Sequence, residues 1–197
     1  MSFKVIIVGG VAGGASAAAR LRRLNETAEI TIYERTGFMS YANCGLPYYL
    51  GDVITDESSL TLQTPEKFYS RFRVQVKVAH EVMRIDRHAK TVTVKDLATN
   101  EVFTDTYDKL ILSPGAHAVI PNIEGIDSEK IFTLRTVEDT LAIDHYIDQT
   151  KAKRALVIGA GFIGLEMAEN LTHRGLDVTL VQRSGSVLPT LDADMAA

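Results

Sequence analysis

The segment KVIIVGGVAGGASAAARLRRL, residues 4–24, decides the fold, because an apolar run passes through a glycine-rich turn into a helix-forming stretch. The segment RALVIGAGFIGLEMAENLTHRG, residues 154–175, repeats this pattern. A second apolar segment with a polar end follows each of them, AEITIYER at 28–35 and LDVTLVQR at 176–183. Strand, glycine turn, helix and strand in this order predict two βαβ units in an α/β fold.

The region between the two units predicts additional elements. The segment VQVKVAHEVMRIDRHAKTVTVKD, residues 74–96, alternates with period two around a polar turn and predicts an antiparallel hairpin. The segment YDKLILSPGA, residues 107–116, predicts one more buried strand that runs into a turn, and Thr136–Thr150 predicts a helix. We expect a first domain at 1–120, a connecting segment at 121–150 and the start of a second domain at 151–197.

The composition favours a protein that acts on small molecules. The chain has 21 Lys and Arg against 25 Asp and Glu, so its net charge of -4 is not typical of a nucleic-acid or membrane-surface binder. We expect no signal peptide and no transmembrane helix, since the early apolar run ends at two glycines, and we expect a cytoplasmic location. The five histidines form no metal-ligand pair on one helix, so we expect no metal site.

The first glycine turn is irregular but has a supporting carboxylate. Glycines at the start of a helix let a pyrophosphate approach the free N–H groups and the positive end of the helix dipole. Gly9 and Gly14 hold the outer positions of the GxGxxG pattern, whereas Val11 replaces the middle glycine. Glu34, at the end of the following strand, is placed to accept hydrogen bonds from an adenosine ribose. A single turn of this kind is equally compatible with a tight strand-helix connection that binds no ligand.

The second turn has the full pattern in Gly159, Gly161 and Gly164, but a neutral residue stands at the strand end. Gln182 replaces the carboxylate there, and Arg183 follows it. A carboxylate would repel a 2′-phosphate, whereas an amide beside a guanidinium tolerates or attracts one, which predicts that NADPH is accepted, alone or alongside NADH. A solvated Arg183 at a strand end is the alternative interpretation.

Cys44 is the only cysteine, and it lies in MSYANCGLPYYLGD, residues 39–52. One cysteine excludes an intrachain disulfide and leaves three interpretations: a buried small apolar residue, a reactive thiol or an intermolecular partner. Pro47 predicts the first turn of a short helix, and the N-terminus of a helix stabilises a thiolate.

The two turns, Glu34 and the segment NCGLPYY together resemble the N-terminal part of the flavin- and pyridine-nucleotide-dependent disulfide reductases, from Lys4 to Met195. The chain resembles the single-cysteine branch, which contains the CoA-disulfide reductases, CoA-persulfide reductases, NADH oxidases and NADH peroxidases. The resemblance implies a glutathione-reductase-like fold with two Rossmann-like dinucleotide-binding units, the second incomplete here. It also implies that residues 1–120 bind FAD and that residues 151–197 begin the NAD(P)-binding domain.

The resemblance assigns residues to each cofactor. It implies that FAD is bound by the first turn, the adjacent strand end, the AHEV strand and a second flavin turn: Gly9, Gly10, Val11, Ala12, Gly13, Gly14, Glu34, Arg35, Val82, Ser113, Pro114 and Gly115. It implies that the second unit binds NADPH or NADH through Gly159, Gly161, Gly164, Glu166, Gln182 and Arg183. Val11 departs from the general motif but matches this branch.

The same resemblance places Cys44 beside the flavin ring, with Tyr49 at the position of the second cysteine of two-cysteine reductases. Cys44 then forms a mixed disulfide with a molecule from outside the chain, or its sulfur cycles through sulfenic acid. The implied route of electrons runs from NAD(P)H through FAD to a Cys44-S-S-CoA mixed disulfide, from which CoA thiol leaves.

Small features discriminate within the branch. The residues around Cys44, Asn43 before it and Gly-Leu-Pro-Tyr after it, resemble those of the CoA-disulfide and CoA-persulfide reductases. In the oxidases and peroxidases the corresponding sequence resembles SCGM or SCGI. Ala12 stands where the peroxidases carry an active-site histidine, which disfavours peroxidase chemistry. The CoA-binding positions of the family, with an arginine cluster suited to a phosphate, imply contacts from Ser16, Arg20, Arg23, Ser40, Asn43 and Arg71.

Alternatives remain for several of these residues. Arg22 belongs to the same cluster as Arg20 and Arg23, and the latter two also fit a solvated helix face beside Glu26. A lysine that binds CoA in some relatives falls at Phe72, between Arg71 and Arg73. Ser40 and Asn43 also fit residues that stabilise a turn by local hydrogen bonds.

We therefore expect an NAD(P)H-dependent flavoprotein that reduces CoA disulfide or CoA persulfide and is a homodimer at full length. The alternatives are an NADH oxidase or peroxidase that cycles Cys44 through sulfenic acid, and a non-catalytic, dinucleotide-binding redox sensor. Because the family extends beyond the residues given, we expect this chain alone to hold the flavin fingerprint and Cys44 but not to turn over efficiently.

Overall fold

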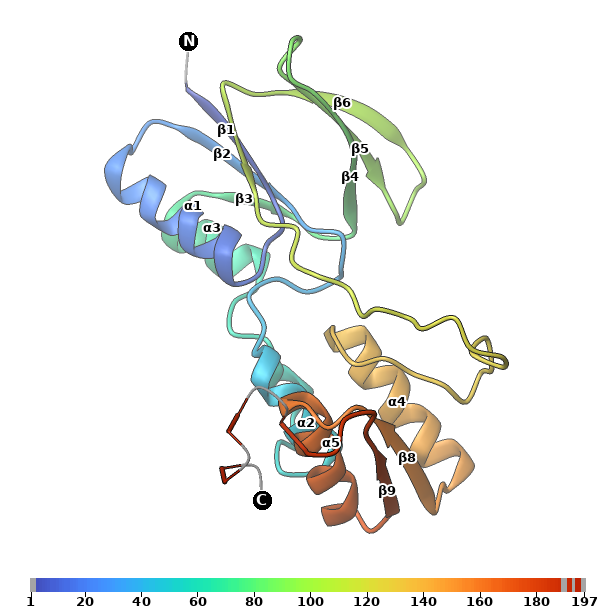
Figure 1. The fold of residues 1–197 in the computed structure, drawn as a ribbon. Helices are drawn as coiled ribbons and strands as arrows, with labels where there is room; N and C mark the ends of the chain where they lie inside the picture. The colour runs from blue at the N-terminus through green and yellow to red at the C-terminus, as the bar shows by residue number, and fades with distance from the viewer. Residues whose placement is uncertain (1–2, 189–190, 193, 196–197) are drawn as a thin grey trace. The chain divides into compact units, whose positions relative to one another are not determined.

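The computed structural model describes residues 3–188, 191–192 and 194–195, which form two compact units (Figure 1). The first unit comprises Met1–Tyr41 and Thr61–His117, and the second comprises Ala42–Leu60 and Ala118–Ala197. Each unit contains one of the two predicted strand-helix-strand arrangements, so the α/β prediction is confirmed.

The first unit is built on a parallel sheet in the order β3-β2-β1-β7. Its strands and the two helices that connect them are β1 (Lys4–Val8), α1 (Ala12–Leu24), β2 (Glu29–Tyr33), α3 (Pro65–Phe72), β3 (Gln75–Lys77) and β7 (Lys109–Leu112). The register of β1 against β2 runs from Lys4 opposite Glu29 to Val8 opposite Tyr33. The two strands therefore end together, at the edge where the glycine turn begins.

Both faces of this sheet are covered. Helices α1 and α3 lie on one face, where Val5, Ile7, Ile32, Phe68 and Val74 form a buried cluster (Figure 1). The other face carries an antiparallel sheet of β4 (His80–Asp86), β5 (Thr91–Asp96) and β6 (Val102–Thr106). Apolar residues of β1, β2 and β5 form the core between the sheets: Ile6, Tyr33, Val92 and Val94. The near-continuous apolar run of β1 follows from its burial on both faces.

The predicted hairpin is confirmed for β4 and β5, which pair antiparallel around a turn at 87–90. The prediction is wrong for Gln75–Lys77, because these residues form β3 and pair parallel to β2. Strand β7 forms as predicted, but the expectation that it is buried is wrong. It is an edge strand of the parallel sheet, and the side chain of Leu112 is 58% exposed. Strand β6 had no counterpart among the predicted elements.

The second unit contains a short parallel pair, β8 (Arg154–Ile158) and β9 (Asp177–Val181), connected by α5 (Phe162–His173). Helix α4 (Val137–Thr150) confirms the predicted helix, with Thr136 and Asp139 forming a capping box at its start. The chain segment around Cys44 contributes η1 (Asn43–Gly45), α2 (Leu46–Leu50) and η2 (Glu57–Leu60) to this unit. The buried core joins α2, α4 and α5 through Leu50, Ile143, Met167, Leu171 and Leu176.

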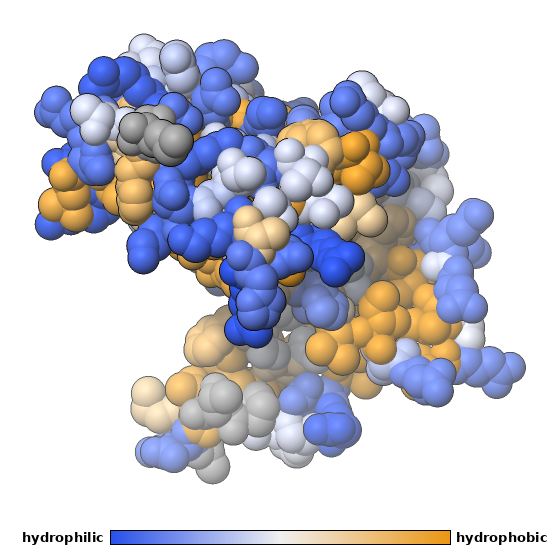
Figure 2. All heavy atoms as spheres, turned by 90° about the horizontal axis from the view of Figure 1, so that it is seen from above, coloured by the Kyte–Doolittle hydropathy of each residue, from blue (hydrophilic) through white to orange (hydrophobic). Residues whose placement is uncertain are grey.

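Apolar side chains also reach the surface in patches, which Figure 2 shows in orange among the hydrophilic residues. In the second unit Leu156, Ile158 and Val181 of the strand pair are 47–69% exposed. Among the described residues no helix is long and apolar enough to cross a membrane.

Candidate functional site

The first glycine turn is shaped by close backbone contacts. Gly9 has φ +97°, and a Cβ atom at this position would lie 2.0 Å from the carbonyl oxygen of Ser113. A Cβ atom on Gly14 would lie 1.8 Å from the carbonyl oxygen of Gly9. Both positions therefore exclude any side chain, and the helix can start immediately behind the strand.

Helix α1 begins at this turn without a capping side chain. Its N-cap residue, Val11, makes no side-chain hydrogen bond to the helix, and the first turn contains no acidic residue. Ala12 and Gly13 are exposed at the start of the helix. The N–H groups and the positive dipole end are therefore available to an anion such as a pyrophosphate.

Glu34 lies against the same turn and is 7% exposed. One carboxylate oxygen accepts a hydrogen bond from the Gly10 N–H at 2.7 Å, and the other accepts from the Thr36 N–H and hydroxyl at 2.9 Å each. An ionised carboxylate has about four lone-pair sites, so about one acceptor site remains for a ribose hydroxyl. The turn and this carboxylate thus fit the pyrophosphate and ribose of a dinucleotide.

The other residues assigned to FAD divide between the turn and the neighbouring strands. The Ser113 N–H donates to the Val8 carbonyl at 2.8 Å, and Gly115 has φ +74°, so the backbone at 113–115 lies directly beside the first glycine turn, but the predicted turn does not form there. Arg35 is exposed and forms a long ion pair of 4.0 Å with Glu81. Val82, on β4, is half-buried beside a β-bulge.

The second glycine turn repeats this local geometry in the other unit. Gly159 has φ +103°, and a Cβ atom on Gly164 would lie 1.8 Å from the Gly159 carbonyl oxygen. Apart from its two chain neighbours, no described residue would lie within 4 Å of a Cβ atom on Gly161. Packing against the described residues therefore does not require glycine at 161, whereas the approach of a ligand to the backbone does. Helix α5 also starts without a capping side chain or an acidic residue.

Gln182 occupies the place in the second unit that Glu34 has in the first. Its Oε1 accepts from the Ala160 N–H at 3.0 Å, and its Nε2 donates to the Ser184 hydroxyl at 2.6 Å. Arg183 is exposed next to it. Glu166 lies on α5 and is half-buried. The absence of a carboxylate at this strand end removes the negative charge that would oppose a 2′-phosphate.

Cys44 is exposed and lies in the single turn η1 that leads into α2. Pro47 occupies the first turn of α2, as predicted. The side-chain oxygen of Asn43 is buried without a hydrogen-bond partner among the described residues, so an acceptor remains unsatisfied directly beside Cys44. Burial and the nearby carboxylates of Asp144 and Glu57 raise the pKa of Tyr49, so its phenol is harder to ionise than that of a free tyrosine.

The residues assigned to CoA fall in both units. Ser16, Arg20 and Arg23 are exposed on α1, and their spacing places them along one side of the helix.

The other residues assigned to CoA lie outside α1. In the first unit, Ser40 has φ +47° and donates its N–H to the Gly10 carbonyl at 3.1 Å. The exposed Arg71 lies over the Phe72 ring. Asn43 belongs to the second unit.

The prediction that Arg22 belongs to a phosphate-binding arginine cluster is wrong. Its side chain is 9% exposed, and its guanidinium donates to the backbone carbonyls of Asn25, Glu26, Phe72 and Arg73 at 2.8–3.2 Å. It therefore connects the end of α1 to the end of α3, and backbone carbonyls take four of its five N–H donors. The cluster is limited to Arg20 and Arg23.

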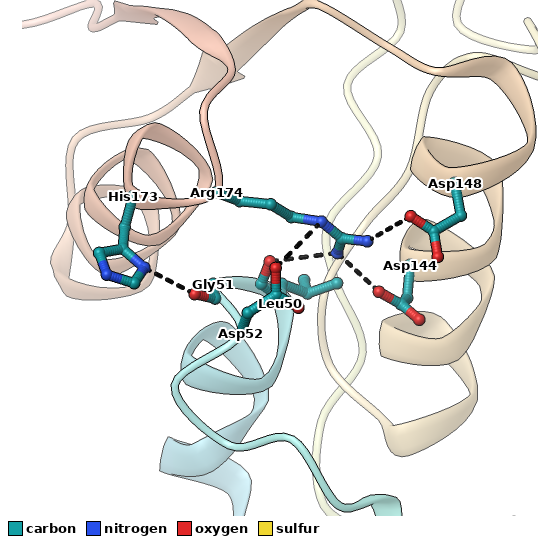
Figure 3. A network of polar contacts seen from close by, with 7 residues as sticks. All are labelled: Leu50, Gly51, Asp52, Asp144, Asp148, His173 and Arg174. Carbon is teal, nitrogen blue, oxygen red and sulfur yellow. Dashed lines mark hydrogen bonds and ion pairs between the residues drawn. The ribbon is translucent and has the colours of Figure 1, made fainter.

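A polar network at the end of α5 was missed by sequence analysis. Figure 3 shows Arg174 among Asp52, Asp144 and Asp148, and His173 directed to the backbone of Gly51. No motif marks these residues in the sequence, since their partners are more than 20 positions away. They lie at the opposite end of α5 from the second glycine turn.

Among the described residues, no group of three or more His, Cys, Asp and Glu side chains could hold a metal ion. The described residues thus offer two glycine turns suited to a dinucleotide and one exposed thiol for chemistry.

Comparisons with known proteins agree with this set of features. Residues 3–197 match the family described as Pyridine nucleotide-disulphide oxidoreductase. The coenzyme A disulfide reductase of Staphylococcus haemolyticus is 53% identical over 192 residues, which are 98% of this chain and 43% of that protein.

Solved structures show the same fold. The crystal structure of reduced Bacillus anthracis CoADR-RHD matches with a TM-score of 0.97 and 52% identity, covering 100% of this chain and 35% of that one. The water-forming NADH oxidase from Lactobacillus brevis bound to NADH matches with a TM-score of 0.91 and 37% identity, over 99% of this chain and 43% of that one. This chain thus spans less than half the length of these relatives.

Proposed function

The chain belongs to the pyridine nucleotide-disulphide oxidoreductase family, and on that basis we propose that it is the flavin-binding and thiol-bearing part of an NAD(P)H-dependent enzyme that reduces CoA disulfide or CoA persulfide. The observation that carries this proposal is the exposure of Cys44, the only thiol, in a chain with two dinucleotide turns. The name of the Staphylococcus haemolyticus relative supports a CoA disulfide as the substrate class.

In this proposal the two turns serve different cofactors. Residues 1–120 form the FAD-binding domain, residues 121–150 connect, and residues 151–197 begin the NAD(P)-binding domain. FAD, when bound, supplies the transfer of two electrons between the nicotinamide and sulfur. The α1 N-terminus would hold its pyrophosphate, Glu34 would accept from its ribose, and residues Arg35, Val82 and 113–115 would complete the site.

Cys44 performs the chemistry on the substrate. Its thiolate attacks one sulfur of CoA disulfide, so a Cys44-S-S-CoA bond forms, the substrate S–S bond breaks, and one CoA thiol leaves with a proton. Two electrons from NAD(P)H and one proton then cleave the mixed disulfide. This step returns the Cys44 thiolate and releases the second CoA thiol. Tyr49 offers no second thiol, so the mixed disulfide cannot be resolved within the chain.

The CoA contacts follow from charge and from the unsatisfied acceptor. Arg20, Arg23 and Arg71 are exposed cations suited to the phosphates of CoA. The side-chain oxygen of Asn43 is buried, so this side chain would turn outward to accept from an amide N–H of the pantetheine arm. Ser16 and Ser40 add hydroxyl groups, and the backbone N–H of Ser40 bonds the Gly10 carbonyl.

Gln182 and Arg183 make NADPH an acceptable reductant in this proposal, because neither repels a 2′-phosphate. We also propose that the full-length protein is a homodimer located in the cytoplasm.

A second candidate function rests on the similarity to the Lactobacillus brevis water-forming NADH oxidase. In that case Cys44 would cycle through sulfenic acid, with oxygen as the acceptor. Ala12 provides no acid-base group for peroxide, which disfavours the peroxidase variant.

The test is Cys44→Ser in the full-length protein, assayed by NAD(P)H oxidation with CoA disulfide, with CoA persulfide and with oxygen alone. We expect the variant to keep bound flavin and to lose CoA-disulfide turnover by about a thousandfold or more, because serine cannot form the mixed disulfide. Undiminished turnover by the variant would sink the proposal, and cysteine-dependent oxygen consumption without CoA would favour the oxidase.

A further inference from the structure

Two side chains at the end of helix α5 donate hydrogen bonds to the backbone at the end of α2. The Arg174 guanidinium donates to the Leu50 carbonyl at 3.2 Å, and the His173 Nδ1–H donates to the Gly51 carbonyl at 2.8 Å (Figure 3). Carbonyls at a helix C-terminus have no partner within the helix, so these two bonds satisfy groups that α2 leaves free. Leu50 itself is fully buried in the core that α2 shares with α4 and α5.

Gly51 allows a very close approach at this place. A Cβ atom on Gly51 would lie 2.3 Å from the side-chain oxygen of Asn170 and 2.7 Å from its Cβ atom. Asn170 is 3% exposed, and its amide donates to the Glu166 carbonyl one turn earlier in α5, so it cannot easily move. At Gly51 the contact with α5 is therefore backbone against side chain, without space for adjustment.

Arg174 is held by carboxylates on three sides. Its side chain is 9% exposed, and its nitrogens lie 2.6 Å from Asp144, 2.8 Å from Asp148 and 3.8 Å from Asp52. Burial opposes its charge, but hydrogen bonding to Asp144 and Asp148 raises the pKa of Arg174 above its usual value. A guanidinium is suited to this place because its fixed fork reaches two carboxylates and a carbonyl simultaneously.

Helix α2 depends on such an anchor. It has five residues, and a helix of this length is not stable by itself in water. Cys44 lies in the single turn directly before it, so the position of the thiol follows the position of α2.

We propose that Arg174, supported by His173, is a positioning residue for Cys44: it fixes the end of α2 on α5 and thereby orders the turn that carries the thiol. This proposal rests on the proposed function for its catalytic meaning. Because α5 starts at the second glycine turn, the same helix joins the proposed dinucleotide site to the cysteine segment.

The test compares Arg174→Met and Arg174→Lys with Arg154→Met in the flavin-loaded, full-length protein, well below its unfolding temperature. Arg154 is a matched control because it is an exposed arginine of the same unit with no ion pair among the described contacts. We expect Arg174→Met to lower kcat for CoA disulfide about tenfold, since small misplacements of a reacting group cost this much or more. The KM for NAD(P)H should stay within about twofold.

Lysine keeps the charge but not the fork, so Arg174→Lys should recover part of kcat, and Arg154→Met should match the wild type. If Arg174→Met does not fold, Arg174→Lys tests the positioning role instead, and we expect it to lower kcat at least threefold. A wild-type kcat in a folded Arg174 variant would overturn the proposal, even if that variant were less stable.

A second readout separates this proposal from the proposed function. The rate of alkylation of Cys44 by iodoacetamide requires no CoA substrate, and we expect Arg174→Met to change it at least threefold while Arg154→Met does not. If the wild type fails to reduce CoA disulfide but this change occurs, the proposed function fails and the positioning role stands. An unchanged alkylation rate contradicts the positioning role.

Discussion

Cys44 is exposed at the start of a single helical turn, and position 49 carries a tyrosine with a raised pKa. A thiol in this setting can be reached by a molecule from solution and has no second thiol in the chain with which to form a disulfide. At the scale of one residue, the chain is therefore arranged for an external sulfur partner.

The glycines of the second turn have separable roles, because Gly164 faces the Gly159 carbonyl, whereas Gly161 faces no other part of the chain that the structure describes. We predict that Gly164→Ala lowers the free energy of unfolding by about 1–3 kcal/mol through overpacking against backbone. Gly161→Ala should leave it within about 0.5 kcal/mol and weaken NAD(P)H binding about tenfold, since the added methyl stands where the backbone meets the pyrophosphate.

Chemical denaturation and dinucleotide titration of the two variants provide the measurement. Equal losses of stability in both would show that position 161 is packed against protein, contrary to the open space seen there.

Asp105 joins the two sheets of the first unit through an ion pair with Lys4 and a hydrogen bond of 2.8 Å from the Tyr33 hydroxyl. Burial opposes its ionisation, but these two partners hold the pKa of Asp105 below its usual value. A carboxyl with a lowered folded pKa stabilises the protein above the unfolded value of about 3.9, and this contribution is lost as the pH falls through the folded value.

We predict that Asp105→Asn lowers the free energy of unfolding at pH 7 by about 1–2 kcal/mol. The difference from the wild type should shrink below about pH 4, where the wild-type carboxyl itself takes up a proton. Urea unfolding across this pH range measures it, with the exposed Asp127→Asn as a control. If Asp105→Asn lowered the free energy of unfolding equally at pH 3 and pH 7, the stabilising role given to the ionised Asp105 carboxylate would be wrong.

At the scale of elements, the two strand-helix-strand arrangements are local copies of each other with one difference in charge. In each, a side chain at the end of the second strand accepts a hydrogen bond from the turn: Glu34 from the Gly10 N–H and Gln182 from the Ala160 N–H. A glutamate at 182 could therefore make the same bond and would add the negative charge that this strand end lacks.

We predict that Gln182→Glu raises the ratio of the NADPH to the NADH dissociation constant by about tenfold, or 1.4 kcal/mol, through repulsion of the 2′-phosphate. Arg183→Met should act in the same direction, because it removes the cation. Thermal-shift titration of the full-length protein with each dinucleotide measures the ratio. Equal stabilisation of wild type and variant by both dinucleotides would refute the role given to this strand end.

The elements that sequence patterns predicted are those with strong local signals. The glycine turns, the capping box at Thr136 and the hairpin turn after Asp86 are each encoded within a few residues. Strand β3 was assigned to the hairpin because alternation with period two does not distinguish parallel from antiparallel pairing. The exposure of β7 follows from its place at the sheet edge, which only the topology reveals.

Arginine roles were the least predictable part of the candidate site. Arg22 and Arg20 are two positions apart on one helix, yet Arg22 is buried against backbone carbonyls and Arg20 is exposed. The partners of Arg174 come from α4 and from the segment after α2, so its role depends on tertiary packing. A charged residue type alone does not indicate whether its donors meet a ligand or the protein.

At the scale of the whole molecule, the strand pair of the second unit is covered on one face only among the described residues. Val157 and Val178 pack into the core, whereas Leu156, Ile158 and Val181 are exposed. The chain spans 43% of the Staphylococcus haemolyticus protein, so the proposed activity has to be measured on the full-length protein.

The central claim is that Cys44 exchanges with a CoA disulfide in a protein that binds FAD. The most direct measurement combines the absorbance spectrum and the intact mass of the full-length protein after incubation with CoA disulfide, without NAD(P)H, and again after NAD(P)H is added. We predict a flavin spectrum, a mass increase of one CoA that maps to Cys44, and loss of that adduct on addition of NAD(P)H. A protein without flavin, or a Cys44 that stays unmodified in the presence of CoA disulfide, would contradict the account.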